Sequence, residues 1–301
     1  MDKNEKEVLD SDYSEYLTLD NLRERLNELK NLKFPNLSKE EIAKIFFGYI
    51  KALPCLTAIY QPEKFNAFNF YRVRLGVNPE LEDLSLIRTF SYPSSHFCSE
   101  NGRANLKNKS VFYCSNSALT SVIESKPKVG EVGYLSIWKS RTNRAMKAGL
   151  FLPQDLRVEN EWRAVCDDAY SHARIESRKT HPEKFPFFHE TLRFISQLYL
   201  DEKHPYYLTS WISDQMLHGL TWKDFLVYPS YANEGYSCNM AIHPNVVDKY
   251  LEFKKVIRFK HIGRKGNLWK FSTGNFGEIH NTNIEWRRAE PGELDLSKLP
   301  G

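Results

Sequence analysis

Apolar residues in the N-terminal part of the chain recur with the spacing of an amphipathic helix. The leucines of residues 19–32, LDNLRERLNELKNL, follow one another at intervals of three and four, which places them on one helical face. The next segment, SKEEIAKIFFGYIKAL, begins with Ser38 and has Glu41 three residues later, the spacing of a capping box. Both patterns predict a helical extension over residues 1–62, and its first residues form an acidic tail.

Beyond these helices the pattern changes to short segments rich in aromatic and β-branched residues, which predict strands. Three helical patterns lie between them, in residues 117–125, 187–200 and 206–219. Residues 251–276 predict a β-hairpin that turns at 263–266 and is followed by a loose tail. The mixture predicts an α+β fold, with strands over residues 68–75, 110–115, 132–138, 224–230 and 236–244.

Composition narrows the class of protein. The chain has 301 residues, 41% of them hydrophobic and 14% aromatic, with a formal net charge of +4. At about 150 residues per domain, this length allows two domains or one domain with extensions. No apolar run approaches the roughly 18 residues of a membrane-spanning helix, and the acidic N-terminus is unlike a signal peptide. We therefore expect a cytoplasmic protein that does not bind a membrane.

Cysteine and histidine spacing gives no sign of a metal site. The five cysteines are an odd number and include no C-x-x-C pair, which favours reduced thiols over disulfides or a zinc cluster. The nine histidines are scattered, and the phosphate-binding, dinucleotide-binding, zinc-protease and serine-hydrolase signatures are absent from the sequence. We expect neither a bound metal nor a cofactor.

Polar residues interrupt an otherwise apolar segment between residues 102 and 138. Arg103 precedes a predicted strand, Tyr113 lies within that strand, and Glu124 is near the end of the following helix. A lone Glu at a helix end is most often only solvated. A functional interpretation of Glu124 therefore depends on the other residues of the pattern.

The order of these residues resembles the RES domain family, which is named for its Arg, Glu and Ser residues. The resemblance covers about residues 68–245. Two departures are a replacement, around Asn108, of the glycine that usually precedes the Tyr strand, and a polar insertion at about residues 140–186. The motif elements that match, in chain order, are Tyr71-Arg72, Gly102-Arg103-Ala104-Asn105, Tyr113, Glu124, Tyr228-Pro229-Ser230, Gly235 and Asn239.

The resemblance implies an ADP-ribosyltransferase-like fold, with a split β-sheet core, flanking helices and the helical N-terminal extension. Residues 63–248 would form the catalytic domain, which the basic hairpin and tail of residues 249–301 would complete. The implied activity is cleavage of the nicotinamide–ribose bond of NAD by a glycohydrolase or phosphorylase, as in toxins of toxin–antitoxin or defence systems. NAD would be the substrate, and a protein acceptor for ADP-ribose is the alternative.

The same resemblance implies partners and site residues. A cognate antitoxin, or the N-terminal extension itself, would inhibit the enzyme, and an oligomer is left open. Catalysis is assigned to Glu124, Arg103, Tyr113 and Ser230, and NAD binding to Tyr71, Arg72, Arg74, Asn105, Tyr228 and Asn239.

The chemistry of the reaction suits these residue types. Nicotinamide leaves as a neutral group from a pyridinium, so the reaction requires stabilisation of an oxocarbenium-like ribosyl cation, which the Glu124 carboxylate can supply. Arginine binds a pyrophosphate through paired hydrogen bonds, and Arg72 or Arg74, on one face of a strand, and Arg103 are the candidates. Tyr113 offers a flat surface for nicotinamide. The Ser230 hydroxyl can bond either Glu124 or the nicotinamide amide.

A rival hypothesis concerns residues 251–270. This segment carries seven basic residues against one acid, with aromatic residues between them, a composition that also occurs at nucleic-acid-binding surfaces. We favour the alternative of a sheet edge that lysines keep unpaired. A catalytically silent relative that only binds a nucleotide is a third hypothesis.

Overall fold

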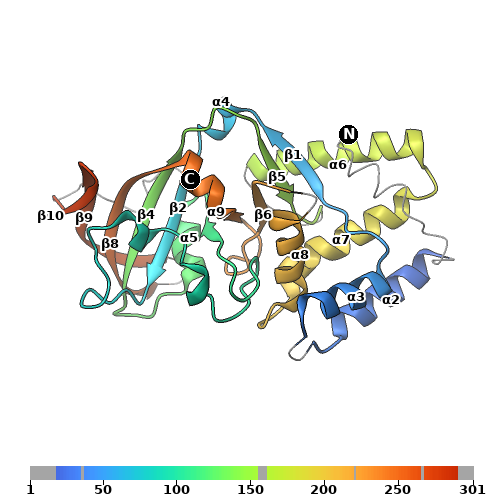
Figure 1. The fold of residues 1–301 in the computed structure, drawn as a ribbon, viewed down its shortest axis with the longest axis horizontal. Coiled ribbons are helices and arrows are strands. Elements are labelled where there is room, and N and C mark those ends of the chain that lie inside the picture. Colours follow the sequence, from blue (N-terminus) through green and yellow to red (C-terminus); the bar gives the residue numbers. More distant parts are fainter. Residues whose placement is uncertain (1–17, 35–36, 155–160, 220–221, 266–267, 291–301) are drawn as a thin grey trace. The chain divides into compact units, whose positions relative to one another are not determined.

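The computed structural model describes residues 18–34, 37–154, 161–219, 222–265 and 268–290 (Figure 1). The predicted acidic tail lies outside these residues. The predicted α+β class is confirmed, because helices alternate with two mostly antiparallel sheets. The chain divides into two compact units: the first comprises Met1–Ile59, Ser95–Lys109 and Lys147–Pro229, and the second comprises Tyr60–Ser94, Ser110–Met146 and Ser230–Gly301.

The first unit contains the two predicted N-terminal helices, α2 (Leu19–Asn31) and α3 (Lys39–Tyr49). The predicted capping box is confirmed: the amide of Glu41 donates to Ser38 Oγ at 3.2 Å, and the amide of Ser38 donates to the Glu41 carboxylate at 2.7 Å. These bonds satisfy amides that would lack partners inside the helix. The sequence thus sets where α3 begins.

Helices α2 and α3 are built into the core of the first unit. They lie beside α7 (Phe185–Asp201) and α8 (Tyr207–His218) (Figure 1). Leu26 of α2 is buried, and the ring of Phe46 in α3 packs 4.7 Å from that of Trp211 in α8. Lys39 forms an ion pair with the buried Asp214 of α8. The N-terminal helices therefore supply part of the unit's hydrophobic core.

Strands of the first unit run in the order β1 (Leu56–Tyr60), β5 (Met146–Leu150) and β6 (Phe225–Pro229), and β5 and β6 are parallel. The stretch expected to be a polar insertion contains β5 and all of helix α6 (Glu161–Thr180). The sequence patterns did not predict β1, β5 or α6. In α6 the buried stripe consists of Trp162, Cys166, Tyr170 and Ser177, so its apolar period is weak.

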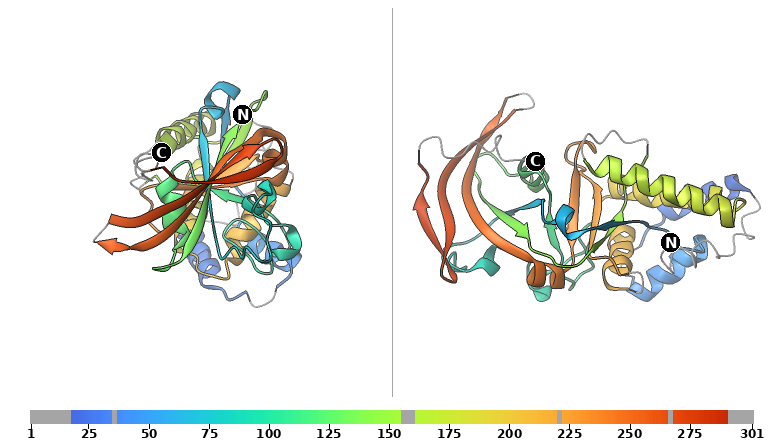
Figure 2. Two further views of the ribbon diagram at one scale, coloured as in Figure 1. Left: turned by 90° about the vertical axis from the view of Figure 1, so that its left-hand side faces the viewer. Right: turned by 90° about the horizontal axis from the view of Figure 1, so that it is seen from above.

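The second unit is built on a five-stranded antiparallel sheet in the order β10-β9-β8-β4-β2. The predicted hairpin is confirmed as β8 and β9, which pair antiparallel with two register shifts and are curved in Figure 2. The expected loose tail is wrong as far as residue 288, because β10 pairs with β9 and Trp286 Nε1 donates to the Leu84 carbonyl at 3.1 Å. The strands are β2 (Asn69–Leu75), β4 (Val132–Ser140), β8 (Leu251–Lys265), β9 (Leu268–His280) and β10 (Asn283–Arg288).

The basic segment at residues 251–270 is not a sheet edge, since β8 pairs with β4 on one side and β9 on the other. Exposed Lys254, Arg258 and Lys260 occupy the solvent face of β8, while Phe253 and Phe259 are buried beneath it. The charges thus belong to one face of an amphipathic strand. This corrects the interpretation of the lysines as guards of an unpaired edge.

Smaller elements complete the second unit. Strand β3 (Phe112–Cys114) pairs with β7 (Cys238–Ile242), and helix α5 (Ala118–Ser125) packs on β2. Backbone hydrogen bonds of 2.8 and 3.0 Å join Tyr71 of β2 to Ser115, just after β3. The remaining elements of this unit are α4 (Pro62–Phe65), α9 (Pro244–Tyr250) and the 3₁₀ helix η1 (Ile87–Phe90), while the 3₁₀ helix η2 (Ser95–Phe97) belongs to the first unit.

All five cysteines are free thiols. Cys114, Cys166 and Cys238 are buried, and burial raises the pKa of the Cys166 thiol to about 12. The expected packing is confirmed for these three thiols, whereas Cys55 and Cys98 are half-exposed. Of the helices that the structure describes, none is both long and apolar enough to cross a membrane.

Candidate functional site

Three donors of the second unit converge on one oxygen of Glu124. Oε1 accepts hydrogen bonds from Ser230 Oγ at 2.5 Å, from Asn239 Nδ2 at 2.8 Å and from the amide of Ala232 at 3.2 Å. Within the described part of the chain, no donor contacts Oε2. The side chain is half-buried. The result is a carboxylate whose orientation is fixed through one oxygen while the other is available to a ligand.

The position of Glu124 near the end of its helix is unfavourable for a negatively charged side chain. Helix α5 begins at the N-cap Ser117 and ends at Lys126, which has a left-handed backbone with φ 49°. Glu124 therefore lies in the last turn, where the negative end of the helix dipole disfavours a carboxylate. The three donors offset that cost. Glu124 is thus more than a solvated residue at a helix end.

A tight loop carries two of the donors. Its ends are joined by the amide of Ser230 donating to the Ser237 carbonyl at 2.8 Å, and the amide of Gly235 donates back to the Ser230 carbonyl at 2.8 Å. Gly235 has φ 85°, a conformation that favours glycine. Thr120 Oγ1 donates to Ser237 Oγ at 2.9 Å and so ties the loop to α5. The spacing between Ser230 and Gly235 in the sequence motif therefore corresponds to the hydrogen bond that closes this loop.

Tyr113 and Asn239 point to the same side of the β3–β7 pair. Tyr113 lies opposite Ala241 in the antiparallel register, and Asn239 is two residues from Ala241 along β7. Opposite residues and residues two apart share a face of a sheet. The half-exposed ring of Tyr113 therefore stands on the face on which Asn239 contacts Glu124.

Arg72 and Arg74 share a face of β2, as predicted, but differ in their contacts. Arg72 donates from Nε to the Ser91 carbonyl and from Nη1 to the Tyr113 carbonyl, each at 3.0 Å. Arg74 donates to the Thr89 carbonyl at 2.5 Å and forms an ion pair of 2.5 Å with Glu82. The charge of Arg74 is therefore compensated by a carboxylate, while Arg72 is anchored to the strand that carries Tyr113.

Tyr71 is a core residue. Its side chain is 1% exposed and packs in a cluster with Val122, Leu135 and Ile257. Burial raises the pKa of its phenol. Tyr71 therefore supports α5 on β2 and presents no surface to NAD, which corrects the assignment of a binding role.

Three other candidates belong to the first unit. Arg103 Nη1 donates to the Tyr199 carbonyl at 2.5 Å and to the Glu202 carbonyl at 3.3 Å, at the C-terminal end of α7, and its guanidinium lies 4.6 Å from the centre of the Tyr206 ring. Such bonds complete a helix C-terminus. Tyr228 is buried with its ring 5.3 Å from that of Tyr199.

Asn105 is also buried in the first unit, and its Nδ2 donates to the Leu106 carbonyl at 3.0 Å. The structure therefore brings Ser230 and Asn239 to Glu124 and gives Arg103, Asn105 and Tyr228 protein partners within the first unit. Sequence reasoning missed the amide of Ala232 and the bond between Thr120 and Ser237. The position of Thr120, one helical turn before Glu124, was the available signal.

No group of three or more His, Cys, Asp or Glu side chains that could hold a metal ion occurs in the part of the chain that the structure describes. Comparison of the chain with protein-family models, with curated proteins and with solved structures found no match. The candidate site thus rests on its geometry, which consists of the Glu124 carboxylate, its three donors and the neighbouring face of β3.

Proposed function

We propose that the second unit cleaves the nicotinamide–ribose bond of NAD, with Glu124 as the catalytic carboxylate of a RES-type site. The observation that carries the proposal is the convergence of Ser230, Asn239 and the Ala232 amide on Oε1, with Oε2 left to the substrate. Residues that are 106 and 115 positions away along the chain meet Glu124. Ser230 and Asn239 belong to the motif segments on which the resemblance to the RES family rests.

The proposed reaction develops a positive charge on the ribose, which a fixed carboxylate can stabilise. When the bond between the ribose C1′ and the nicotinamide nitrogen breaks, its electron pair goes to the nitrogen and the ribosyl carbon becomes cationic. An oriented carboxylate stabilises that cation and can accept a hydrogen bond from a ribose hydroxyl. Water, phosphate or a protein side chain then forms the new bond to C1′. Because the three donors bond Oε1, Oε2 of Glu124 is the oxygen proposed to face the ribose.

Arg72 and Tyr113 complete the proposed site. The guanidinium of Arg72 is the proposed contact for the pyrophosphate, because it bonds the carbonyl of Tyr113 within the second unit, whereas Arg74 is paired with Glu82 and Arg103 belongs to the first unit. The Tyr113 ring is the proposed platform for nicotinamide. These assignments narrow the set of residues that the motif alone suggests.

The proposal includes an ADP-ribosyltransferase-like split-sheet core for the second unit. Two features support it: the β10-β9-β8-β4-β2 sheet is joined to the β3–β7 pair through Tyr71 and Ser115, and α5 carries Glu124. The biological role that we propose is that of an NAD-depleting toxin whose inhibitor is a separate antitoxin. Helices α2 and α3 form part of the core of the first unit, which favours a structural role for them over self-inhibition.

The test is nicotinamide release from NAD by the purified full-length chain. Glu124→Gln keeps an oxygen acceptor for the three donors and removes only the charge, so we expect release to fall at least 100-fold with an unchanged circular dichroism spectrum. Glu63→Gln, at an exposed position of α4, is the matched control and should behave like wild type. Equal release by both variants would refute the role of Glu124.

Mass spectrometry of the other product separates the acceptors. Free ADP-ribose indicates water, ADP-ribose 1″-phosphate indicates phosphate, and a modified polypeptide indicates protein ADP-ribosylation. If NAD stayed intact with water, with phosphate and with protein as the acceptor, the enzymatic proposal would be overturned.

A further inference from the structure

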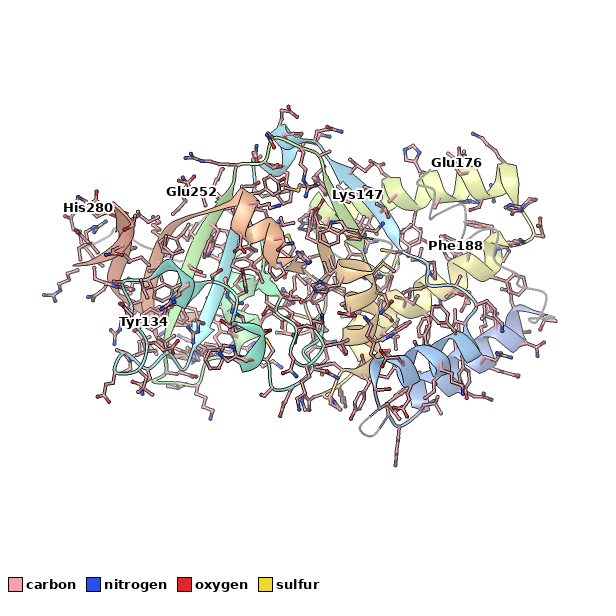
Figure 3. All side chains as sticks on the ribbon, viewed as in Figure 1. Tyr134, Lys147, Glu176, Phe188, Glu252 and His280 are labelled. Carbon is pink, nitrogen blue, oxygen red and sulfur yellow. The ribbon has the colours of Figure 1, made fainter. Side chains whose placement is uncertain are left out.

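Helices α6 and α7 of the first unit line a cavity of about 260 Å³. Figure 3 labels Glu176 on α6 and Phe188 on α7, which identify the two helices. Tyr170, Arg174 and Arg178 face the cavity from α6 at intervals of four residues, so they form one stripe of the helix. The opposite wall consists of Phe185 and His189 of α7, and Gln154 completes the lining.

Arg174 and Arg178 carry the positive charge of the cavity lining. Among the residues that the structure describes, neither forms a hydrogen bond or an ion pair, and both are exposed. Nearby basic residues on the same two helices do have such partners: Arg163 with Asp167, Lys179 with Glu176, and Arg193 with Glu190. Two guanidinium groups in the lining of one cavity, without ion-pair partners among the described residues, suit an anion that accepts several hydrogen bonds, as a phosphate does.

The rest of the wall is aromatic. The centre of the His189 ring lies 5.8 Å from that of Tyr170 and 5.9 Å from that of Phe185, and His189 Nε2 is 3.1 Å from Gln154 Oε1. Burial lowers the pKa of His189; the positive charges of Arg193 and Arg174 also lower it, and Glu190 opposes them. The imidazole is therefore neutral at pH 7, and the wall can contact the face of a heterocyclic ring.

Helix α7 adds a third feature. It begins at Phe185, and its N-cap residue Lys184 supplies no side-chain cap. Phe185, the first residue of α7, lines the cavity, so the positive end of the helix dipole lies beside the cavity lining, and such ends favour phosphate groups.

We propose that this cavity binds a mononucleotide, with Arg174 and Arg178 holding the phosphate while Phe185 and His189, which are half-buried, contact the base. A volume of about 260 Å³ is below the roughly 300–1,000 Å³ of pockets for drug-sized ligands. It suits one nucleoside phosphate better than a dinucleotide such as NAD. The inference concerns the first unit and does not depend on the proposed activity of Glu124.

Isothermal titration calorimetry of the full-length chain with AMP tests the proposal. We expect Arg174→Gln/Arg178→Gln to weaken AMP binding at least 20-fold. Lys179→Gln removes a positive charge from the same helix but does not line the cavity, so it should change the Kd less than twofold. Absence of AMP binding at millimolar concentration, or an equal loss in both variants, would overturn the proposal.

Three further measurements test where and how AMP binds. A phosphate bound by Arg174 offsets a positive charge that helps to lower the pKa of His189, so the NMR titration of the imidazole should move to higher pH; an unchanged titration would contradict the site. Glu124→Gln should bind AMP as wild type does, and a loss there would assign AMP to the Glu124 site instead. Inorganic phosphate should bind at least tenfold more weakly than AMP, and equal affinities would refute the aromatic contact with the base.

Discussion

Replacing Asn239 with Asp provides the sharpest test of the Glu124 cluster, because it exchanges a donor for a second negative charge. Asn239 Nδ2 lies 2.8 Å from Glu124 Oε1. At that separation and an effective dielectric constant of about 20, two unit charges repel each other by about 6 kcal/mol. The two carboxyl groups therefore share one proton instead of both ionising, as paired carboxylates in other proteins do.

Proton sharing makes the effect depend on pH. Above about pH 5 the unfolded chain has released that proton while the folded pair keeps it, so rising pH favours unfolding. The free energy of unfolding of Asn239→Asp should fall below that of wild type by about 1.4 kcal/mol per pH unit. Between pH 5 and pH 8 the accumulated difference reaches about 3–4 kcal/mol. Below pH 5 the shared proton restores a hydrogen bond, and the two proteins should be similarly stable.

Urea denaturation followed by circular dichroism, at pH 5, 6, 7 and 8, measures this difference. Asn239→Ala is the control, because it loses the hydrogen bond to the carboxylate, worth about 1.5–3 kcal/mol, without adding charge. Its difference from wild type should be the same at every pH. If Asn239→Asp showed the same flat profile as Asn239→Ala, the contact between Asn239 and Glu124 would be refuted.

Three further predictions concern other parts of the chain. Lys39→Met leaves the buried carboxylate of Asp214 unpaired and should lower the unfolding free energy by about 3–5 kcal/mol. Adding Asp214→Asn should restore part of the lost unfolding free energy, and the absence of any recovery would argue against the ion pair. Leu26→Ala, at a buried position of α2, should cost about 2–5 kcal/mol in the same denaturation assay, whereas a cost near zero would mean that α2 is separable. The thiol of half-exposed Cys98 should react with a thiol reagent in the native protein, while Cys166, whose pKa burial raises to about 12, should react only on unfolding.

Local sequence signals predicted a good part of the fold. The capping box of Ser38 and Glu41 and the strands that became β2, β4 and β7 are patterns complete within a few residues. Helix α6 was missed because its buried stripe uses Trp, Cys, Tyr and Ser in place of Leu or Ile. Strand β10 was missed because its pairing with β9 and the contact of Trp286 with Leu84 are tertiary.

In the candidate site, too, local patterns could be predicted from the sequence and tertiary contacts could not. The meeting of Ser230 with Glu124 was one of two alternatives for that hydroxyl, and the structure selects it. The burial of Tyr71 could not be predicted, because it depends on which face of β2 the helix α5 covers. The partners of Arg103 lie 96 and 99 residues away, and no pattern around Arg103 indicates them.

The central position of β8 sets an order of events during synthesis. The cluster on which α5 rests includes Ile257 and Phe259 of β8 and Phe276 of β9, residues that the ribosome adds more than 130 positions after Glu124. A nascent chain that has been synthesised through Asn239 already contains Ser230, Ala232 and Asn239, the donors to Glu124. It still lacks the residues of β8 and β9 against which helix α5 packs. Helix α5 can therefore rest on its complete hydrophobic support only after β8 and the Phe276 region of β9 have been synthesised.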